Sequence, residues 1–221
     1  MNTDLINYYC NRAKEYDKVY LNPAEQTDLQ TATRLFQTLF YQKVVLEIAC
    51  GTAYWTDRIA KTATAVDAID ANKQMIEIAK GRINADNVVF HVADMYAFVP
   101  EKRYDGLFGG FIWSHIPLQD LDRFIDTLQN WLIPDSMVVF IDSNYVANTY
   151  HDKKNIAQTD EHGNTYQARE LENGENYLVL KNFPTHDLLL KKLSRIATEI
   201  ECIDLTHYWI VSAKTKAASG K

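Results

Sequence analysis

Short apolar runs alternate with segments of helical periodicity along most of the chain. Runs at 44–48, 65–70, 88–93, 104–111 and 137–142 are rich in β-branched and aromatic residues, which predicts strands buried on both faces. Between these runs, apolar residues recur three and four positions apart, as on one face of an amphipathic helix. Strands that alternate with helices predict an α/β fold with a doubly wound, mostly parallel sheet.

The N-terminal region predicts helices rather than strands. Residues 3–20 and 24–41 have helical patterns that are separated by a proline-containing break. Tyr8, Tyr16 and Tyr20 fall on roughly one face of the first helix. Such a face either packs its rings on a core or closes as a lid over a cationic ligand.

The C-terminal third contains a long connection. Residues 146–183 exceed the usual length of a connection, and polar alternation around the Asn-Gly pair at 173–174 predicts a β-hairpin insert over the sheet edge. A helix at 185–196 and two strands at about 198–205 and 207–214 complete the expected elements.

Length, charge and cysteine usage narrow the class of protein. With 221 residues and 47% hydrophobic content the chain fits one domain, and its net charge of −6 disfavours a nucleic-acid partner and favours a small-molecule substrate. No apolar run reaches the roughly 20 residues of a membrane span, and the N-terminus lacks a signal-peptide pattern. Cys10, Cys50 and Cys202 are widely separated, so neither disulfides nor a metal site are expected, and the predicted location is cytoplasmic.

The first strand leads directly into a turn of small residues. Glu47 lies near the strand's end, and Ala49, Cys50 and Gly51 form the turn before a helix near Trp55. Backbone N–H groups of such a turn point outward, so a ligand can lie against the main chain. A dinucleotide-binding turn would need G-x-G-x-x-G, and only Gly51 is present, which disfavours a diphosphate without excluding it.

Acidic residues follow each of the next two strands. Asp70 ends the second strand at the place where open α/β sheets hold ribose hydroxyls, although it could instead cap the following helix. Asp94 follows the third strand, where a carboxylate can accept from an adenine amine. We therefore expect Glu47, Asp70 and Asp94 to converge on one ligand at the carboxyl edge of the sheet.

The fourth strand ends in glycines and an aromatic segment. Gly109 and Gly110 permit close approach of a backbone to a ligand. His115 follows, and because a histidine has an unperturbed pKa of about 6.5 it is a candidate general base. It could equally cap or pack against the next helix.

Three segments resemble one known family. E-x-A-C-G-T-x-Y-W-T at 47–56 resembles motif I of the class I, Rossmann-like, S-adenosylmethionine (SAM)-dependent methyltransferases. Y-x-x-R-A-x-E-Y-D at 9–17 resembles the helix that caps the SAM site in small-molecule members, and Y-D-x-x-F-x-G-F-x-x-S-H-I-P at 104–117 resembles their segment after the fourth strand. The similarity covers about residues 8–144, and glycine is more usual in the family at Ala53.

The resemblance implies a seven-stranded sheet with an antiparallel final hairpin, SAM as cofactor, S-adenosylhomocysteine (SAH) as product and a small-molecule methyl acceptor. It also implies a set of cofactor contacts: Tyr8, Arg12, Tyr16, Tyr20, Glu47, Ala49, Cys50, Gly51, Trp55, Asp70, Ala71, Met75, Asp94, Met95, Gly110 and Phe111. The candidate catalytic residues are His115 as base and Tyr9, Asn144 and Tyr166 as orienting groups. The candidate substrate contacts are Trp113, Arg169 and Tyr177.

One domain of residues 1–221 is expected. Its parts are a helical cap at 1–41, a cofactor-binding core at 42–144, a substrate cap insert at 145–183, a C-terminal helix and hairpin at 184–214, and a tail at 215–221. A monomer and a homodimer are both compatible with this sequence.

Other enzyme classes lack their motifs. Tyr150 and Lys154 have the Y-x-x-x-K spacing of short-chain dehydrogenases, but no glycine-rich dinucleotide turn accompanies them. The sequence contains neither G-x-S-x-G nor a phosphate-binding G-x-x-x-x-G-K-[ST] loop. Two alternatives stay open, namely an internal reaction of SAM and a non-catalytic SAM-binding module. The acceptor atom also stays open, and an acceptor that is already anionic would need no base.

Overall fold

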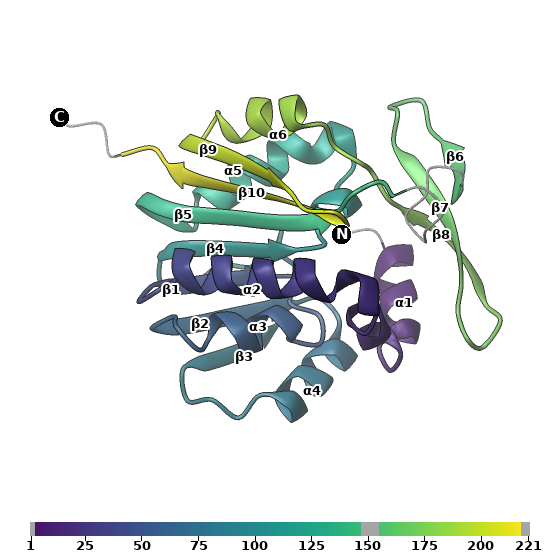
Figure 1. The fold of residues 1–221 in the computed structure, drawn as a ribbon, viewed down its shortest axis with the longest axis horizontal. Coiled ribbons are helices and arrows are strands. Elements are labelled where there is room, and N and C mark those ends of the chain that lie inside the picture. Colours follow the sequence, from purple (N-terminus) through teal and green to yellow (C-terminus); the bar gives the residue numbers. More distant parts are fainter. Residues whose placement is uncertain (1–2, 147–154, 218–221) are drawn as a thin grey trace.

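The computed structural model describes residues 3–146 and 155–217. The main sheet has seven strands in the order β3-β2-β1-β4-β5-β10-β9. These strands are β1 Val44–Ile48, β2 Ala65–Asp70, β3 Val88–Val92, β4 Tyr104–Gly110, β5 Leu132–Ser143, β9 Ala197–Asp204 and β10 Tyr208–Thr215. The first five pair in parallel, whereas β10 is antiparallel to both β5 and β9 (Figure 1). The predicted fold class is therefore confirmed.

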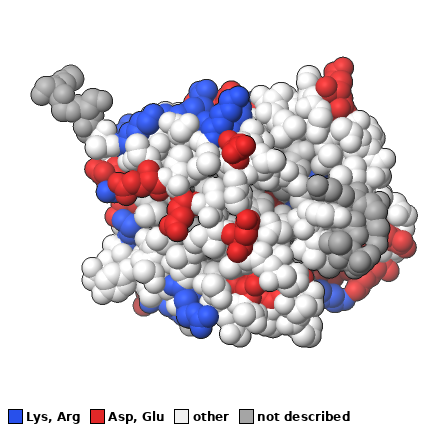
Figure 2. Space-filling view, turned by 45° about the horizontal axis from the view of Figure 1, so that its top comes forward, with Lys and Arg blue, Asp and Glu red and all other residues white. Residues whose placement is uncertain are grey.

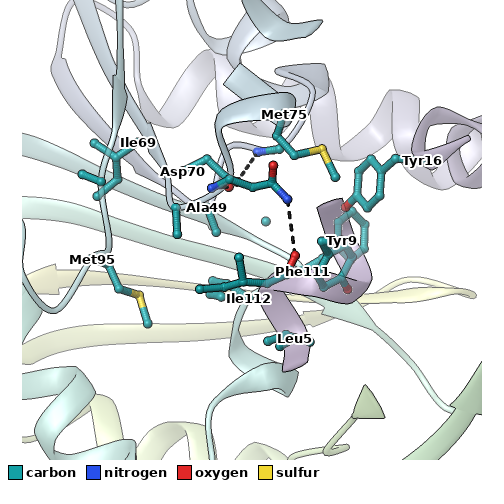
Figure 3. Close-up of a pocket in the computed structure, with 16 residues that line it drawn as sticks. Leu5, Tyr9, Tyr16, Ala49, Ile69, Asp70, Met75, Met95, Phe111 and Ile112 are labelled. Atoms are coloured by element: carbon teal, nitrogen blue, oxygen red, sulfur yellow. Dashed lines mark hydrogen bonds between the residues drawn. The ribbon is translucent and has the colours of Figure 1, made fainter. Parts of the chain in front are cut away.

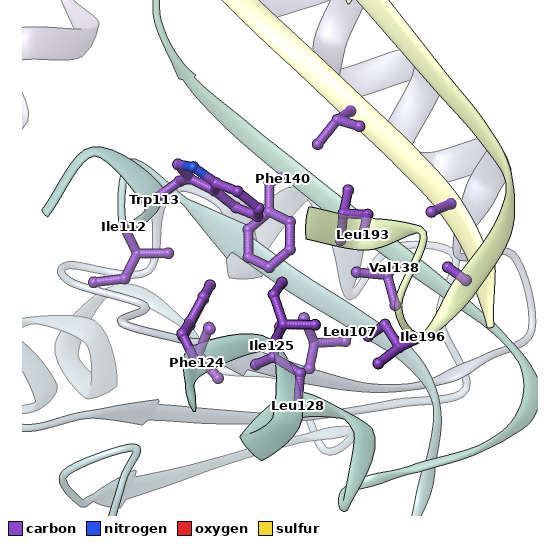
Figure 4. Close-up of a cluster of buried hydrophobic side chains, with 14 of the residues drawn as sticks. Leu107, Ile112, Trp113, Phe124, Ile125, Leu128, Val138, Phe140, Leu193 and Ile196 are labelled. Carbon is purple, nitrogen blue, oxygen red and sulfur yellow. The ribbon is translucent and has the colours of Figure 1, made fainter. Parts of the chain in front are cut away.

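Helices cover both faces of this sheet (Figure 1). They are α1 Thr3–Arg12, α2 Gln26–Leu39, α3 Tyr54–Ile59, α4 Lys73–Arg82, α5 Leu121–Gln129 and α6 His186–Leu193. One core contains α2 and α3 residues such as Phe36 and Trp55, and the other contains α5 and α6 residues such as Phe124 and Leu193 (Figure 4). Two cores on opposite faces hold the carboxyl edge of the parallel strands in place.

The N-terminal segment differs from the single helix expected over 3–20. Helix α1 ends at Arg12, and a 3₁₀ helix follows over Tyr16–Tyr20. The connecting turn is tight, because the Glu15 N–H donates to the Arg12 carbonyl at 3.0 Å. This turn directs Tyr20 toward the core, where its ring stacks on Tyr54 with centroids 3.6 Å apart. The segment over 3–20 therefore consists of two helices joined by a turn, and Tyr20 packs in the core.

The insert forms a separate three-stranded antiparallel sheet beside α1 (Figure 1). Its strands are β6 Ile156–Thr159, β7 Thr165–Glu170 and β8 Asn176–Leu180. The β7–β8 hairpin agrees with the predicted hairpin, whereas β6 was not predicted because it is short and mostly exposed. The Tyr150 and Lys154 pair lies outside the described residues.

Two other boundaries differ from expectation. Strand β5 begins at Leu132, five positions before the predicted start at 137, so Pro134 lies within a strand. Helix α5 correspondingly ends at Gln129. In the part of the chain that the structure describes, no helix is long and apolar enough to cross a membrane.

Candidate functional site

The turn after β1 is held in an unusual backbone conformation. Ala49, Gly51 and Ala53 have φ values of 51°, 55° and 66°. Asp70, at the end of β2, accepts hydrogen bonds from the backbone N–H of Gly51 at 2.9 Å and of Asn72 at 2.8 Å. Asn72 caps α4 with its own side chain, which accepts from the Gln74 N–H at 2.9 Å. The capping function considered for Asp70 thus belongs to Asn72, and the Asp70 carboxylate joins the turn to the next helix.

A cavity of about 630 Å³ lies directly against this turn (Figure 3). Its lining comes from α1, the 3₁₀ helix after it, the start of α4 and the segments at the carboxyl ends of β1, β2, β3 and β4: Leu5, Ile6, Tyr9, Tyr16, Ala49, Gly51, Ile69, Asp70, Ala71, Asn72, Met75, Ala93, Met95, Gly110, Phe111 and Ile112. We call it the first cavity. In Figure 3, Tyr9 and Tyr16 lie at one end and Ile69 and Met95 at the other.

Helix α1 and the 3₁₀ helix after it cover the first cavity. The Asn72 amide donates to the Ile6 carbonyl at 3.4 Å, which ties α1 to the start of α4. In the 3₁₀ helix, Asp17 accepts from the Thr52 hydroxyl at 2.5 Å and pairs with Arg82. These contacts favour the lid interpretation of the tyrosine-rich segment, because they join it to the turn and to α4.

The three expected carboxylates do not share one cavity. Asp70 lines the first cavity, but Glu47 is buried beneath the turn with 1% of its surface exposed and lines no cavity described above. Asp94 accepts from the Tyr96 N–H at 2.9 Å and lines a different cavity between its own loop and β8. The expected convergence is wrong in this respect. The position of a residue at the end of a strand predicts at which edge of the sheet it lies, but it does not predict the direction in which its side chain points.

Glu47 is a buried acid with an unsatisfied oxygen. Among residues 3–146 and 155–217, Glu47 Oε2 has no hydrogen-bond partner, and burial raises the pKa of Glu47 to about 8. Near pH 7 Glu47 is therefore mostly protonated, and it lies beneath the turn without lining the first cavity.

Replacing Glu47 with glutamine should remove a pH dependence of stability. The folded protein holds the Glu47 proton up to about pH 8, whereas an ordinary glutamate releases it at about 4.5, so the free energy of unfolding should fall as pH rises between these values. The expected loss is roughly 4 kcal/mol in the wild type and is absent in Glu47→Gln. Urea denaturation at pH 5 and pH 8.5 measures it, with exposed Glu77→Gln as control. Parallel pH profiles for wild type and Glu47→Gln would contradict the assignment.

A second, larger cavity adjoins the first. It has a volume of about 1300 Å³, and Tyr9, Tyr16 and Phe111 line both cavities. A group that passes from one cavity to the other must therefore cross this aromatic boundary. The remaining lining comes from α1, the 3₁₀ helix, the insert and the strand ends: Tyr8, Arg12, Glu15, Lys18, Val19, Asn22, Glu25, His115, Ser143, Arg169, Glu170, Leu171, Val179, Lys181 and Tyr208.

His115 and Tyr9 form a hydrogen-bonded pair at this boundary. His115 Nδ1 lies 2.5 Å from the Leu180 carbonyl oxygen, which can only accept, so Nδ1 carries the proton and donates. Nε2 then accepts from the Tyr9 hydroxyl at 2.7 Å. Burial, with the charges of Lys181 and Arg169, lowers the pKa of His115 to about 4. His115 is thus neutral near pH 7 and a weak base.

Lys181, which follows β8, fastens the insert to the main sheet. Its Nζ donates to Asp142 at 2.7 Å and to the Ser114 hydroxyl at 2.9 Å, and the lysine is only 4% exposed. Asp142 also accepts from the backbone N–H groups of Ser114 and Ser143. Burial alone would raise the pKa of Asp142, but Lys181 and these donors hold it below its ordinary value.

Several predicted cofactor contacts lie outside the first cavity. Tyr8 and Arg12 line the second cavity, and Tyr20 stacks in the core. Trp55 packs under Gly110, where an added Cβ would approach its ring to 2.7 Å. Gly110 therefore makes room for Trp55 as well as lining the first cavity, and Cys50 is buried beside them in the core.

The predicted catalytic and substrate residues are also dispersed. Trp113 is 1% exposed and packs against Phe140, so it is a core residue and not an acceptor contact (Figure 4). Asn144 donates to the Leu205 and Tyr208 carbonyls at 2.8 and 3.0 Å and thereby supports the β9–β10 hairpin.

The insert residues differ in position as well. Tyr177 accepts from Asn11 at 2.7 Å and so joins the insert to α1. Tyr166 lines the cavity that contains Asp94, and Arg169 alone of the three insert candidates lines the second cavity.

Sequence reasoning missed some lining residues. Leu5, Ile6 and Asn72 reach the first cavity because α1 folds back over α4, which no local pattern shows. Lys181 could have been noticed as a lone cation within the apolar segment 178–183. Among residues 3–146 and 155–217, no group of three or more His, Cys, Asp or Glu side chains could hold a metal ion, so the site offers carboxylate, backbone and aromatic groups to an organic ligand.

Comparison with known proteins finds relatives over part of the chain. Residues 45–135 match the family model described as "Methyltransferase domain". The chain is 34% identical over 98 residues to a malonyl-[acyl-carrier protein] O-methyltransferase of Priestia megaterium, covering 43% of this chain and 35% of the relative. It is 24% identical over 168 residues to malonyl-[acyl-carrier protein] O-methyltransferase 2 of Ilyobacter polytropus, covering 72% of this chain and 60% of the relative. The chain thus spans between about a third and 60% of the length of these curated relatives.

Solved structures extend the likeness to the whole fold. The structure described as a DhpI–SAH complex superposes with a TM-score of 0.79 at 23% identity, covering 98% of this chain and 99% of that one. The N-methyltransferase NodS of Bradyrhizobium japonicum WM9 in complex with SAH superposes with a TM-score of 0.70 at 15% identity, covering 96% and 98%. The fold is therefore the Rossmann-like methyltransferase fold. Over residues 45–135 the chain is similar to the methyltransferase-domain family.

Proposed function

We propose that this protein binds SAM in the first cavity and transfers its methyl group to a small-molecule acceptor in the second. The observation that carries the proposal is the Asp70 carboxylate, which the Gly51 and Asn72 N–H groups fix at the edge of the first cavity. A carboxylate held in this way can accept from both hydroxyls of a ribose.

The other lining residues fit the remaining parts of SAM. Met75, Ala93 and Met95 offer apolar surfaces for an adenine, and the positive-φ turn at Ala49 and Gly51 offers backbone groups to the methionine end. The rings of Tyr9 and Tyr16 have centroids 5.8 Å apart at the boundary between the cavities. Aromatic faces hold a sulfonium cation without a fixed countercharge.

Methyl transfer needs positioning more than covalent help from the protein. When bound, SAM supplies an electrophilic methyl group for in-line displacement. Tyr9 and Phe111 line both cavities and so can align an acceptor with that methyl while excluding water. For an acceptor that must lose a proton, His115 Nε2 is the nearest candidate base, with Tyr9 as the orienting group. An anionic acceptor requires no base.

We also propose that the protein is located in the cytoplasm, is a monomer or a homodimer, and has no nucleic-acid partner. Cys10, Cys50 and Cys202 are free thiols, which suits a reducing compartment. Figure 2 shows acidic and basic side chains interspersed over one face, without the continuous basic surface that a phosphate backbone requires.

Incubation of the purified protein with methyl-labelled SAM and a cell extract tests the function. We expect the label to appear in a new small molecule, whose mass identifies the acceptor. Consumption of SAM with no labelled product would favour an internal reaction of SAM, and tight binding without consumption would favour a non-catalytic module. Absence of binding would refute all three.

A further inference from the structure

We propose that the Tyr9 hydroxyl oxygen selects the methyl acceptor by accepting a hydrogen bond from it. The acceptor then belongs to the class of molecules that present an O–H or N–H group at the boundary between the two cavities. His115 is the positioning residue that keeps Tyr9 in this state. The inference rests on the proposed function, because it names the substrate class of the same site.

Two consecutive hydrogen bonds determine what Tyr9 can offer to a ligand. A carbonyl oxygen can only accept, so His115 Nδ1, which lies 2.5 Å from the Leu180 carbonyl oxygen, must donate. The neutral ring then has a lone pair at Nε2, which accepts from the Tyr9 hydroxyl at 2.7 Å. A tyrosine hydroxyl has one proton, and His115 engages it. The Tyr9 oxygen can therefore accept from a ligand, but it has no proton left to donate.

The shared proton stays on Tyr9. Burial raises the pKa of Tyr9 well above its ordinary value, and burial also lowers the pKa of His115 to about 4. Both groups are therefore neutral near pH 7. The hydrogen bond between them keeps one direction, from the tyrosine hydroxyl to the imidazole.

Neighbouring aromatic rings hold Tyr9 in place. The Tyr9 ring meets the rings of Tyr8, Tyr16 and His115 edge to face, with centroids 4.9, 5.8 and 5.5 Å away. Such arrangements are the favoured ones for aromatic pairs. The hydroxyl oxygen of a ring held on three sides has a fixed position, which selection by one hydrogen bond requires.

The end of the insert holds the segment that contains His115. The Asn182 backbone N–H donates to the Ser114 carbonyl at 2.9 Å, and the Asn182 side-chain amide donates to the Ile116 carbonyl at 3.1 Å. The residue between them, His115, donates to Leu180 of the same insert. Both ring nitrogens of His115 are thus engaged by protein groups, so the imidazole acts on a ligand through Tyr9.

Tyr9 lies where the methyl group must cross. It lines both cavities, and Figure 3 shows it beside Tyr16 at one end of the first cavity. His115 lines the second cavity but not the first, so the hydroxyl that bonds to it lies toward the second cavity. A ligand O–H or N–H there satisfies a buried accepting oxygen, whereas a ligand oxygen without a proton brings lone pairs together.

Titration of SAH-saturated protein with 2-pyrrolidone and with γ-butyrolactone, followed by NMR, tests the selection. The two rings have nearly the same shape and differ by an N–H group in place of a ring oxygen. We expect 2-pyrrolidone to bind at least tenfold more tightly, because the lactone offers no proton to Tyr9. Binding of 2-pyrrolidone no tighter than that of γ-butyrolactone would overturn the proposal.

Four variants assign the preference to the Tyr9–His115 pair. Tyr9→Phe and His115→Leu should each reduce it below threefold, the second because the freed Tyr9 proton can then donate to the lactone. His115→Gln should retain it, because the glutamine oxygen can accept from Tyr9. Tyr41→Phe, at a side chain that is 61% exposed, should change nothing.

The preference would contradict the proposal if it survived in Tyr9→Phe, or if both His115 variants lost it equally, which would indicate a merely structural role. Unchanged SAH affinity shows that each variant is folded. Failure of the wild type to bind SAH would instead refute the proposed function.

NMR of protein labelled with ¹⁵N-histidine tests the direction of the hydrogen bonds. The His115 signals are identified by their absence in His115→Gln. We expect a proton on Nδ1 and none on Nε2 near pH 7. A proton on Nε2 would make Tyr9 the accepting partner of His115 and would overturn the proposal.

Discussion

Replacing Asp70 by asparagine is expected to weaken SAM and SAH binding by about a hundredfold. The carboxylate can accept two charge-assisted hydrogen bonds from ribose hydroxyls, each contributing roughly 1.5–3 kcal/mol, and asparagine keeps only one accepting oxygen. That oxygen is also needed by the Gly51 and Asn72 N–H groups, which lie at 2.9 and 2.8 Å from the carboxylate. The loss should therefore appear as a weaker equilibrium affinity for both molecules, measured by isothermal titration calorimetry.

The matched control is Glu77→Gln on α4, because Glu77 has a side chain 64% exposed and pairs only across the helix surface with Lys73 at 3.8 Å. It removes the same charge from the next helix without touching the first cavity. Unchanged affinity in Asp70→Asn would remove the cofactor assignment, and an equal loss in Glu77→Gln would show that the effect is a general one of charge.

Replacing Lys181 by methionine is expected to destabilise the protein by about 3–5 kcal/mol. The substitution leaves Asp142 buried without its cation, and breaking a buried ion pair costs about that much. Lys181 Nζ lies 2.7 Å from Asp142 Oδ1, and both side chains are almost completely buried. We therefore expect the cost of breaking a buried ion pair rather than that of breaking an exposed one. Urea denaturation at constant pH measures the change in the free energy of unfolding.

Two further variants separate charge from packing. The double variant Lys181→Met with Asp142→Asn should recover part of the loss, because no uncompensated charge remains. Lys73→Met removes an exposed lysine whose side chain is 75% exposed and should cost less than about 1 kcal/mol. A cost for Lys181→Met no larger than that of Lys73→Met would contradict the account of this network.

The strands of the main sheet could be predicted because their burial leaves a pattern within a short stretch of the sequence. The central parallel strands are buried on both faces, so each appears in the sequence as a short apolar run, as at Val44–Ile48. The small-residue turn after it and Asp70 at the end of β2 follow from the same pattern. The β7–β8 hairpin was predictable because Asn-Gly specifies a tight turn.

The remaining features depend on tertiary contacts. Helix α1 ends at Arg12 and Tyr20 stacks on Tyr54, and no local pattern of the first helix shows either feature. Glu47 and Asp70 both lie at strand ends in the sequence, yet Glu47 is buried under the turn whereas Asp70 lines the first cavity. The sequence pattern does not distinguish these two positions. Likewise, nothing in the sequence near Trp113 distinguishes a residue that faces a ligand from one that packs in the core.

A crystal structure of the protein grown with saturating SAH tests the central claim most directly. We expect the ribose hydroxyls on Asp70, the adenine beside Met75 and Met95, and the sulfur at the boundary formed by Tyr9, Tyr16 and Phe111. Density for SAH in another cavity, or none despite saturation, would contradict the account.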